Sequence, residues 1–399
     1  MLTRPGRPCY ALDMQIDAND PRTWPKSALE FLHRRERATL GSAPLVAQIR
    51  ERIERGGPIP FAEFMRLALY HREHGYYASP DLKMGREGDF LTSPETHPAF
   101  GALVCRRLQR IWEALGAPGR FEVVEGGPGS GALAEQILDY AGARFPALAD
   151  AIRCTLVEAS AALRGRQAER LARHGDRVRW VESLAAIPPA SVTGCVLSNE
   201  LLDALPVHRV RMTPDGLREI HVGLRDGEFT DVPLPLSTPE IAAFFEGVGV
   251  WPPPGADAEA GLAAAAWYRA AAERLARGAL LTIDYGHPAG ALYTSARRRG
   301  TLLCYYRHTA NEEPYRRVGT QDITAHVDFT AVRAAGEAAG LTTRAVTTQD
   351  EWLRSLGIDD WLSGRERWPD GQPRRPDDLL ALIRPSGLGR LRVLIQTTH

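Results

Sequence analysis

Lysine and net charge are both nearly absent from this chain of 399 residues. Only two of its 49 basic residues are lysines, Lys26 and Lys83, and 49 acidic residues balance the total. We interpret the arginine bias as a coding-composition effect, because alanine, glycine and proline are also abundant. A balanced charge gives no long-range field toward nucleic acid or an anionic membrane surface. The composition therefore predicts neither of these partners.

Long apolar runs and organised cysteines are missing as well. No segment approaches the roughly 18–20 apolar residues that a membrane-spanning helix needs. The five cysteines stand far apart, and none belongs to a Cys-x-x-Cys motif. This spacing argues against a disulfide framework and fits a reducing compartment. Residues 1–27 lack the apolar centre of a secretory signal, and their aspartates argue against a transit peptide.

The length allows one large domain with insertions, or two domains. Residues 1–40 are expected to be a disordered extension, although a helical pattern covers 28–39. The next region, 41–118, has apolar residues at helical spacing. Its predicted helices cover 45–55, 61–70 and 97–116.

From residue 119 to 399, apolar runs alternate with amphipathic segments. The predicted strands cover 121–125, 153–157, 178–181, 194–198, 279–284, 342–347 and 391–397. The predicted helices between them cover 131–143, 160–173, 262–277, 327–339 and 349–356. Such alternation is typical of an α/β fold with a mostly parallel sheet covered on both faces. An insertion at about 207–260 begins as a β-hairpin and is either a lid, a substrate wall or an edge cover.

The stretch from Phe121 to Ile137 carries the clearest ligand signal. An apolar strand ends at an acid, a glycine-rich turn follows, and a helix begins. Glycines permit a tight turn and close approach of a ligand, and the helix N-terminus offers free N–H groups. The residues predicted to bind are Glu125, Gly127, Gly129 and Gly131. The pattern fits S-adenosylmethionine (SAM) and also satisfies the looser dinucleotide pattern, so the loop alone does not choose between SAM and NAD.

Polar residues follow the next two strands as well. Glu158 ends the second strand, where a carboxylate can accept hydrogen bonds from both ribose hydroxyls of a nucleoside. Glu182 and Ser183 follow the third strand, at a position that commonly meets an adenine ring. The alternative is a surface acid and a solvated loop. We predict an adenosine site that includes all three residues.

The fourth strand is followed by Asn199, Glu200 and Asp203. Two acids and an amide can hold a cationic acceptor such as a guanidinium group, or accept a proton from it. Alternatively, the acids only stabilise a helix N-terminus. We predict catalytic roles for Glu200 and Asp203 and a cofactor contact for Asn199. Farther on, Asp322 is a candidate cap for the helix that follows it.

No metal site is expected. Cys304, His308 and His326 do not repeat a metal-ligand spacing. His71 and His74 lack the glutamate that completes a helical metal motif.

Several segments, taken in order, resemble one family. They are Phe64–His71, Gly75–Tyr77, Gly88–Glu95, Glu125–Gly129, Ser198–His208, Ile283–Gly286, Gly300–His308 and Gly319–Phe329. These blocks are similar to the signature blocks of the MidA family of SAM-dependent class I methyltransferases, and the resemblance covers about residues 45–397. Leu201 and Leu202 stand where the family is expected to carry aromatic residues, which would reshape the acceptor pocket.

The resemblance implies a class I SAM methyltransferase fold with a seven-stranded sheet. Residues 41–118 would form a helical cap and a SAM-covering loop, and residues 119–399 the methyltransferase core. Thr92 and Ser93 would reach the cofactor from that loop. Because a mitochondrial relative methylates an arginine of a respiratory complex I subunit, the resemblance implies a protein arginine N-methyltransferase acting on a protein partner.

Three questions stay open at this level. A SAM-fold assembly or scaffolding protein with weak or no catalysis is the alternative function. The expected compartment is the cytoplasm in a bacterium and the mitochondrial matrix in a eukaryote. A homodimer is one option for the assembly state.

Overall fold

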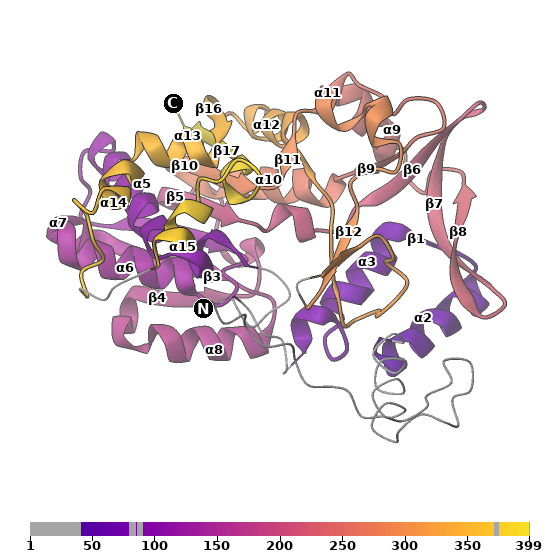
Figure 1. The fold of residues 1–399 in the computed structure, drawn as a ribbon, viewed down its shortest axis with the longest axis horizontal. Helices are drawn as coiled ribbons and strands as arrows, with labels where there is room; N and C mark the ends of the chain where they lie inside the picture. The colour runs from indigo at the N-terminus through magenta and orange to yellow at the C-terminus, as the bar shows by residue number, and fades with distance from the viewer. Residues whose placement is uncertain (1–40, 80–84, 86–90, 308, 371–374, 399) are drawn as a thin grey trace, which may run out of the picture.

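The structure is a computed structural model that describes residues 41–79, 85, 91–307, 309–370 and 375–398. The expected N-terminal extension and its helix at 28–39 lie outside the described residues, as do residues 88–90 of the Gly88–Glu95 loop. Figure 1 shows two lobes: an α/β lobe, and a second lobe built on a separate antiparallel sheet.

A seven-stranded sheet forms the centre of the α/β lobe. Its strands are β2 (Phe121–Gly126), β3 (Ile152–Val157), β4 (Val178–Val181), β5 (Val192–Asn199), β10 (Leu275–Asp284), β16 (Thr342–Thr348) and β17 (Arg392–Thr397). The order is β16-β17-β10-β5-β2-β3-β4, with β17 antiparallel to both neighbours and the remaining pairs parallel. This mostly parallel, seven-stranded sheet confirms the predicted fold class. Apolar strands that alternate with helices bury both of their faces when helices cover the two sides of the sheet.

Successive residues of the central strands face opposite sides of this sheet. Val123 packs on the side of α5 and α6, whereas Val124 packs on the side of α10 and α12. The covering helices are α5 (Ala99–Ala114), α6 (Ala132–Arg144), α7 (Pro146–Ala151), α13 (Gln349–Ser355), α14 (Ile358–Leu362) and α15 (Pro376–Ala381) on one face, and α10 (Leu262–Arg274) and α12 (Phe329–Ala338) on the other. Burial of both faces explains why the strands read as unbroken apolar runs. A further helix, α8 (Ala161–Leu171), follows β3.

Two predicted helices have different ends. The helix predicted at 262–277 stops at Arg274, because Leu275 already pairs with Val192 in the β10–β5 ladder. The helix predicted at 327–339 begins at Phe329, because the two residues before it form β15 (Val327–Asp328), which pairs with β11 (Gly286–His287). Sheet pairing overrode the helical periodicity in both places.

The second lobe is built on β6 (His208–Thr213), β7 (Gly216–Arg225), β8 (Glu228–Leu234), β9 (Asp257–Ala260) and the two-residue β1 (Ile59–Pro60). Strands β6 and β7 pair antiparallel through the turn at 213–216, and β8 pairs with the far side of β7. Helices α2 (Ala43–Gly56) and α3 (Phe61–Tyr70) pack against this sheet (Figure 1). Helix α9 (Glu240–Val248), inside the insertion, was not predicted.

A small sheet lies next to α3. It consists of β12 (Leu303–Tyr306), β13 (Thr309–Asn311) and β14 (Asp322–Thr324), in the order β13-β12-β14. Among the described residues, no helix combines the length and apolarity that crossing a membrane requires.

Candidate active site

The glycine-rich loop between β2 and α6 has the strained geometry that its sequence predicts. Gly127, Gly129 and Gly131 have φ angles of 61°, 57° and 80°. L side chains rarely adopt these angles, so the alternating glycines are required by the backbone path. A Cβ added to Gly127 would lie 2.7 Å from the Cδ1 atom of Leu201. The missing side chain of Gly127 therefore lets Leu201 lie close to the loop backbone at the carboxyl edge of the sheet.

A short helix, α4 (Ser93–Thr96), is fastened to this loop. The Ser130 hydroxyl donates to the Glu95 carboxylate, and Arg170 donates to the Ser130 oxygen at 2.7 Å. On the other side, the Ser93 amide donates to Oε1 of Glu200 at 3.0 Å. The segment that was predicted to cover the cofactor thus joins the glycine loop to the predicted catalytic acid. Thr92 precedes α4 as its N-cap residue.

Glu158 lies where it was predicted, at the end of β3, and only 9% of its surface is exposed. Its carboxylate accepts hydrogen bonds from the Ser160 amide at 2.8 Å and from Gln167 Nε2 at 3.3 Å. Burial raises the pKa of this carboxyl above its ordinary value, while those two donors oppose the rise. Each oxygen keeps a lone pair, so the side chain can still accept from a pair of hydroxyls.

Glu182 and Ser183 follow β4 and are both exposed. Glu182 forms an ion pair with Arg164 at 3.1 Å, and Arg164 also donates to the backbone oxygen of Glu158. Both residues lie at the same sheet edge as Glu158, because β3 and β4 are parallel neighbours. Their contact with adenine stays a prediction.

Glu125 and Asn199 end the two neighbouring strands β2 and β5 and are both buried. Burial alone raises the pKa of Glu125 to about 8. The Asn199 side chain donates from Nδ2 to Glu200 at 3.0 Å, whereas its buried Oδ1 atom has no hydrogen-bond partner within the described residues. A buried carboxyl and an orphaned amide oxygen both suit the ammonium group of an amino-acid ligand.

Glu200 combines burial with backbone strain. Its φ angle is 52°, in the left-handed region where residues other than glycine are uncommon. Burial raises the pKa of its carboxyl to about 7, with a further rise from Asp284, while the Ser93 amide and the Asn199 side chain oppose it. Strain of this kind, held by surrounding contacts, is concentrated at functional sites.

Three more acidic residues lie around the turn that follows β5 and contains Glu200. Asp203 is 8%, Asp284 0% and Asp322 3% exposed. Burial and the neighbouring carboxyls raise the pKa of Asp203 well above its ordinary value, and burial raises that of Asp284 to about 7. We call Glu200, Asp203, Asp284 and Asp322 the acidic cluster. Burial therefore favours the neutral form of Glu200, Asp203 and Asp284, and a bound cation would favour their charged form.

Asp284 organises the backbone of the turn. Its Oδ2 atom accepts from the amides of Leu201 and Leu202 at 3.2 and 2.8 Å, and its Oδ1 atom accepts from the Tyr285 amide at 2.8 Å. These bonds connect the end of β10 to the residues between Glu200 and Asp203. The carboxylate therefore fixes where both predicted catalytic acids stand.

Tyrosines enclose the acidic cluster. The Tyr77 hydroxyl donates to Oδ1 of Asp322 at 3.0 Å, and the Tyr70 ring lies 5.3 Å from the Tyr77 ring. Burial raises the pKa of Tyr285 far above its ordinary value, and Glu200 and Asp203 raise it further. The pKa of Tyr305, on β12, is likewise raised, first by burial and then by Asp203. Aromatic rings beside buried carboxylates form a suitable lining for a planar cation.

Sequence reasoning left several of these residues without a role. Asp322 was considered only as a helix cap, but it lies in β14, and Asp328 caps α12 by accepting from the amides of Thr330 and Ala331. Asp284 and the tyrosines stand in the family-like blocks, and that position was their only signal. Segments far apart in the chain bring them together, so no local spacing could reveal the cluster.

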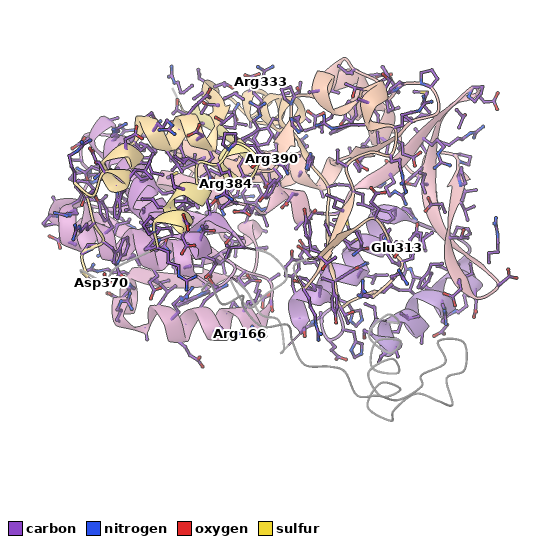
Figure 2. The ribbon with its side chains drawn as sticks, in the orientation of Figure 1. Arg166, Glu313, Arg333, Asp370, Arg384 and Arg390 are labelled. Carbon is purple, nitrogen blue, oxygen red and sulfur yellow. The ribbon has the colours of Figure 1, made fainter. Side chains whose placement is uncertain are left out.

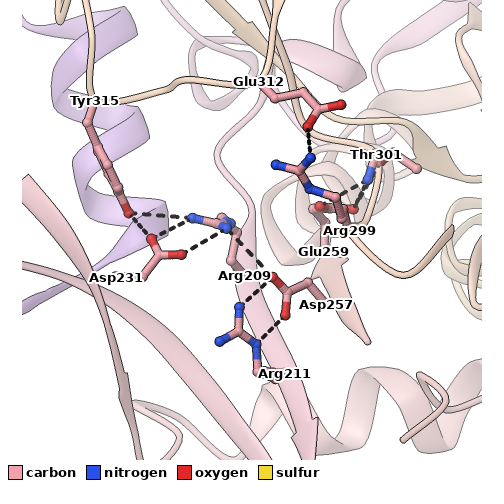
Figure 3. A network of polar contacts seen from close by, with 9 residues as sticks. All are labelled: Arg209, Arg211, Asp231, Asp257, Glu259, Arg299, Thr301, Glu312 and Tyr315. Atoms are coloured by element: carbon pink, nitrogen blue, oxygen red, sulfur yellow. Dashed lines mark hydrogen bonds and ion pairs between the residues drawn. The ribbon is translucent and has the colours of Figure 1, made fainter. Parts of the chain in front are cut away.

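The second lobe carries a separate network of polar contacts (Figure 3). Arg209 pairs with Asp231 at 2.9 Å, and Tyr315 donates to the same carboxylate at 2.5 Å. Arg211 pairs with Asp257 at 2.5 Å. The arginines of this network are thus paired with carboxylates of the second lobe. Throughout the described part of the chain, no group of histidines, cysteines and acids is arranged to hold a metal ion.

Comparisons with known proteins agree with this geometry. Residues 103–347 match a family of S-adenosyl-L-methionine-dependent methyltransferases. The Bos taurus protein arginine methyltransferase NDUFAF7, mitochondrial, is 33% identical over 352 residues, which are 79% of this chain and 74% of that protein. The Drosophila melanogaster homolog is 31% identical over 335 residues, which are 76% of this chain and 72% of that protein.

A solved structure from Burkholderia thailandensis, bound to S-adenosyl-homocysteine, superposes with a TM-score of 0.80 at 34% identity, covering 89% of this chain and 92% of that one. The family match resolves the ambiguity of the glycine loop in favour of SAM over NAD. The chain belongs to the MidA family of S-adenosyl-L-methionine-dependent methyltransferases.

Proposed function

We propose that this chain is a protein arginine N-methyltransferase whose acceptor guanidinium binds in the acidic cluster. The support is that Glu200, Asp203 and Asp284 stand together as buried carboxyls whose pKa values are raised by burial. A guanidinium group is always charged and carries five planar donors, which match a set of carboxylates better than an ammonium group does. Relatives are named protein arginine methyltransferases, which agrees with this acceptor.

Cofactor binding is assigned to the edge formed by β2, β3, β4 and β5. The backbone at Gly127, Gly129 and Gly131 and the carboxyl of Glu125 would hold the amino-acid part. Glu158 would hold the ribose. The remaining proposed contacts come from Thr92, Ser93, Glu182, Ser183 and Asn199. When bound, SAM supplies a methyl group on a positively charged sulfur, which is already a strong leaving group.

The protein then has two tasks, orientation and proton removal. Oriented reactants can gain roughly 7–11 kcal/mol over free ones. Glu200 and Asp203 would fix the guanidinium so that one nitrogen faces the methyl group. Methylation of an arginine releases one proton, and a carboxylate with a pKa near 7, as burial gives Glu200, can accept it.

The compartment and the assembly state remain expectations that follow from this function. Mitochondrial placement appears in the names of relatives. We expect the mitochondrial matrix if the source is a eukaryote and the bacterial cytoplasm otherwise. The partner is a protein that presents an arginine, nucleic acid is not expected, and a homodimer is open to a sedimentation measurement.

The first experiment is calorimetric titration with S-adenosylhomocysteine, with NADH as the competing cofactor class and Glu158→Ala as the binding variant. Micromolar binding of S-adenosylhomocysteine alone, lost in the variant, is expected. Methylated arginine peptides that are missing from a deletion strain then identify the acceptor by mass spectrometry. Methylation found only on another residue type would refute the arginine assignment, and complementation by Glu200→Ala, Asp203→Ala would favour the scaffolding alternative.

A further inference from the structure

A second charged group lies beside the acidic cluster and has the opposite sign. It consists of His287, Arg297, His326, Arg390 and Arg392, which we call the cationic cluster. The side chains come from the segments after β10, the loop before β12, the approach to β15, and the start of β17. Because β17 runs antiparallel to β10, its first residue, Arg392, pairs with Asp284 at the carboxyl edge of the sheet. Topology therefore places this cluster at the acceptor side of the site.

Contacts within the cluster are close. The His287 and His326 rings lie 5.4 Å apart, and Nη2 of Arg297 lies 3.0 Å from Nε2 of His287. Burial, together with the charges of Arg297, Arg392 and Arg390, lowers the pKa of His287 to about 4. The pKa of His326 is also lowered to about 4, by burial and then by His287, Arg297 and Arg390. Both histidines are thus neutral, and the arginines carry the charge.

Two buried nitrogen atoms of this cluster lack partners within the described residues. The buried Nδ1 atom of His326 and the buried Nε atom of Arg392 make no hydrogen bond. Hydrogen bonds from Thr347 and Thr348 to Oε2 of Glu351 lower the pKa of that carboxyl, and Arg392 lowers it to a smaller extent. Unsatisfied donors next to positive charge are the lining that a carboxylate requires.

Tyr285 joins the two clusters. The guanidinium of Arg390 stands 6.0 Å from the centre of the Tyr285 ring, while Glu200 and Asp203 act on the hydroxyl of the same residue. Arg390 lies in the middle of Figure 2, where the two lobes meet. Arg297 and His326 also line a hollow of about 1130 Å³ on the second lobe, beside the network of Figure 3. A peptide lying in this hollow would contact Arg297 and His326 of the cationic cluster.

We propose that the cationic cluster binds an acidic side chain of the protein substrate, near in sequence to the acceptor arginine. The inference rests on the proposed function. It adds that the protein selects an acceptor arginine that has a glutamate or aspartate nearby in the substrate sequence. An adjoining negative and positive pocket discriminate against peptides that carry only one of the two charges. Arg297, Arg390 and Arg392 are specificity residues in this assignment, because they contact the substrate away from the transferred methyl.

The test measures binding of labelled twelve-residue peptides to the full chain saturated with S-adenosylhomocysteine, by fluorescence anisotropy. Each peptide has one arginine and one glutamate, at spacings from four residues before to four residues after it, and a matched peptide carries glutamine instead. At one or two spacings the glutamate peptide should bind about tenfold more tightly, equivalent to about 1.4 kcal/mol. The variant Arg297→Gln, Arg390→Gln, Arg392→Gln should lose this preference while binding glutamine peptides as the parent does.

Arg384→Gln is the matched control, because Arg384 is exposed near Arg390 (Figure 2) and lies outside the cluster. It should keep the full preference. The variant Arg390→Glu should invert the preference toward lysine in place of glutamate, which covers the case of a triple variant that folds poorly. Equal binding of glutamate and glutamine peptides at every spacing would overturn the proposal, as would a preference that survives the triple variant.

Failure of the arginine assignment has a different signature. If the acceptor is not arginine, replacing the peptide arginine by norleucine leaves binding unchanged while the glutamate dependence persists. If only the cationic cluster is misassigned, the norleucine peptide binds more weakly and the glutamate dependence is absent.

Discussion

Single residues of the acidic cluster separate cofactor binding from chemistry. Glu200→Gln keeps an oxygen that can accept from the Ser93 amide but removes the charge and the proton-accepting capacity. We expect S-adenosylhomocysteine affinity to stay within about threefold and kcat on a verified acceptor to fall by about 10²–10⁴, the usual range for a general base. Glu169→Gln, on the exposed side of α8, is the control. Full turnover by Glu200→Gln would remove this residue from the reaction.

Glu125 makes cofactor affinity depend on pH. Its carboxyl, with a pKa of about 8 because of burial, is protonated at neutral pH in the free protein. A ligand ammonium group favours the ionised form, so binding releases a proton and the affinity rises with pH toward 8. Calorimetry between pH 6 and 7.5 should show Kd for S-adenosylhomocysteine falling by up to about tenfold per pH unit. The slope should vanish in Glu125→Gln, and a slope retained there would assign the proton to another group.

At the scale of elements, Asp284 connects the end of β10 to the turn after β5. Asparagine has one carbonyl oxygen, so Asp284→Asn can no longer serve amides on both sides. Loss of a buried acceptor costs about 1–3 kcal/mol in the free energy of unfolding. We also expect kcat to fall by about 10–100-fold with KM for SAM nearly unchanged, since orientation of the acceptor is lost and the glycine loop is untouched.

Urea unfolding and steady-state kinetics on one preparation check both parts. A purely structural role for Asp284 would lower the stability and leave kcat per folded molecule intact. Activity equal to that of the parent would show that the turn is held in place by its other contacts.

The whole molecule should lose stability as the solution becomes more basic. Burial raises the folded-state pKa values of Glu125, Glu200 and Asp284 to about 8, 7 and 7, above those of the unfolded chain. Their contribution to the free energy of unfolding is complete below the pKa values of the unfolded chain. It is lost as the pH rises through the pKa values of the folded protein. His287 and His326 have lowered pKa values, so they change the free energy of unfolding only below about pH 6.5, the pKa of histidine in the unfolded chain.

Between pH 6.5 and 8.5 the free energy of unfolding should therefore decrease by on the order of 2–3 kcal/mol. Urea midpoints at constant ionic strength measure this change. Glu125→Gln should flatten the decrease, and Glu169→Gln should not. A stability that is constant or rises across this interval would mean that the buried acids are already compensated.

The succession of strands and helices along the chain was predicted from the sequence by itself, as was the position of the cofactor edge. Apolar runs such as those around Val123 and Val196 are continuous because both faces of the sheet are buried, and that signal is local. The glycines at 127, 129 and 131 can also be recognised from the sequence, because their φ angles disfavour other residues.

Only the tertiary structure assembled the two charged clusters. Asp284 and Asp322 lie far apart in sequence, and each looks ordinary until parallel strands and β14 bring them beside Glu200. Arg392 gains its place because β17 returns antiparallel to β10. Burial then raises or lowers the pKa values, and burial is a property of the packed molecule that no residue spacing contains.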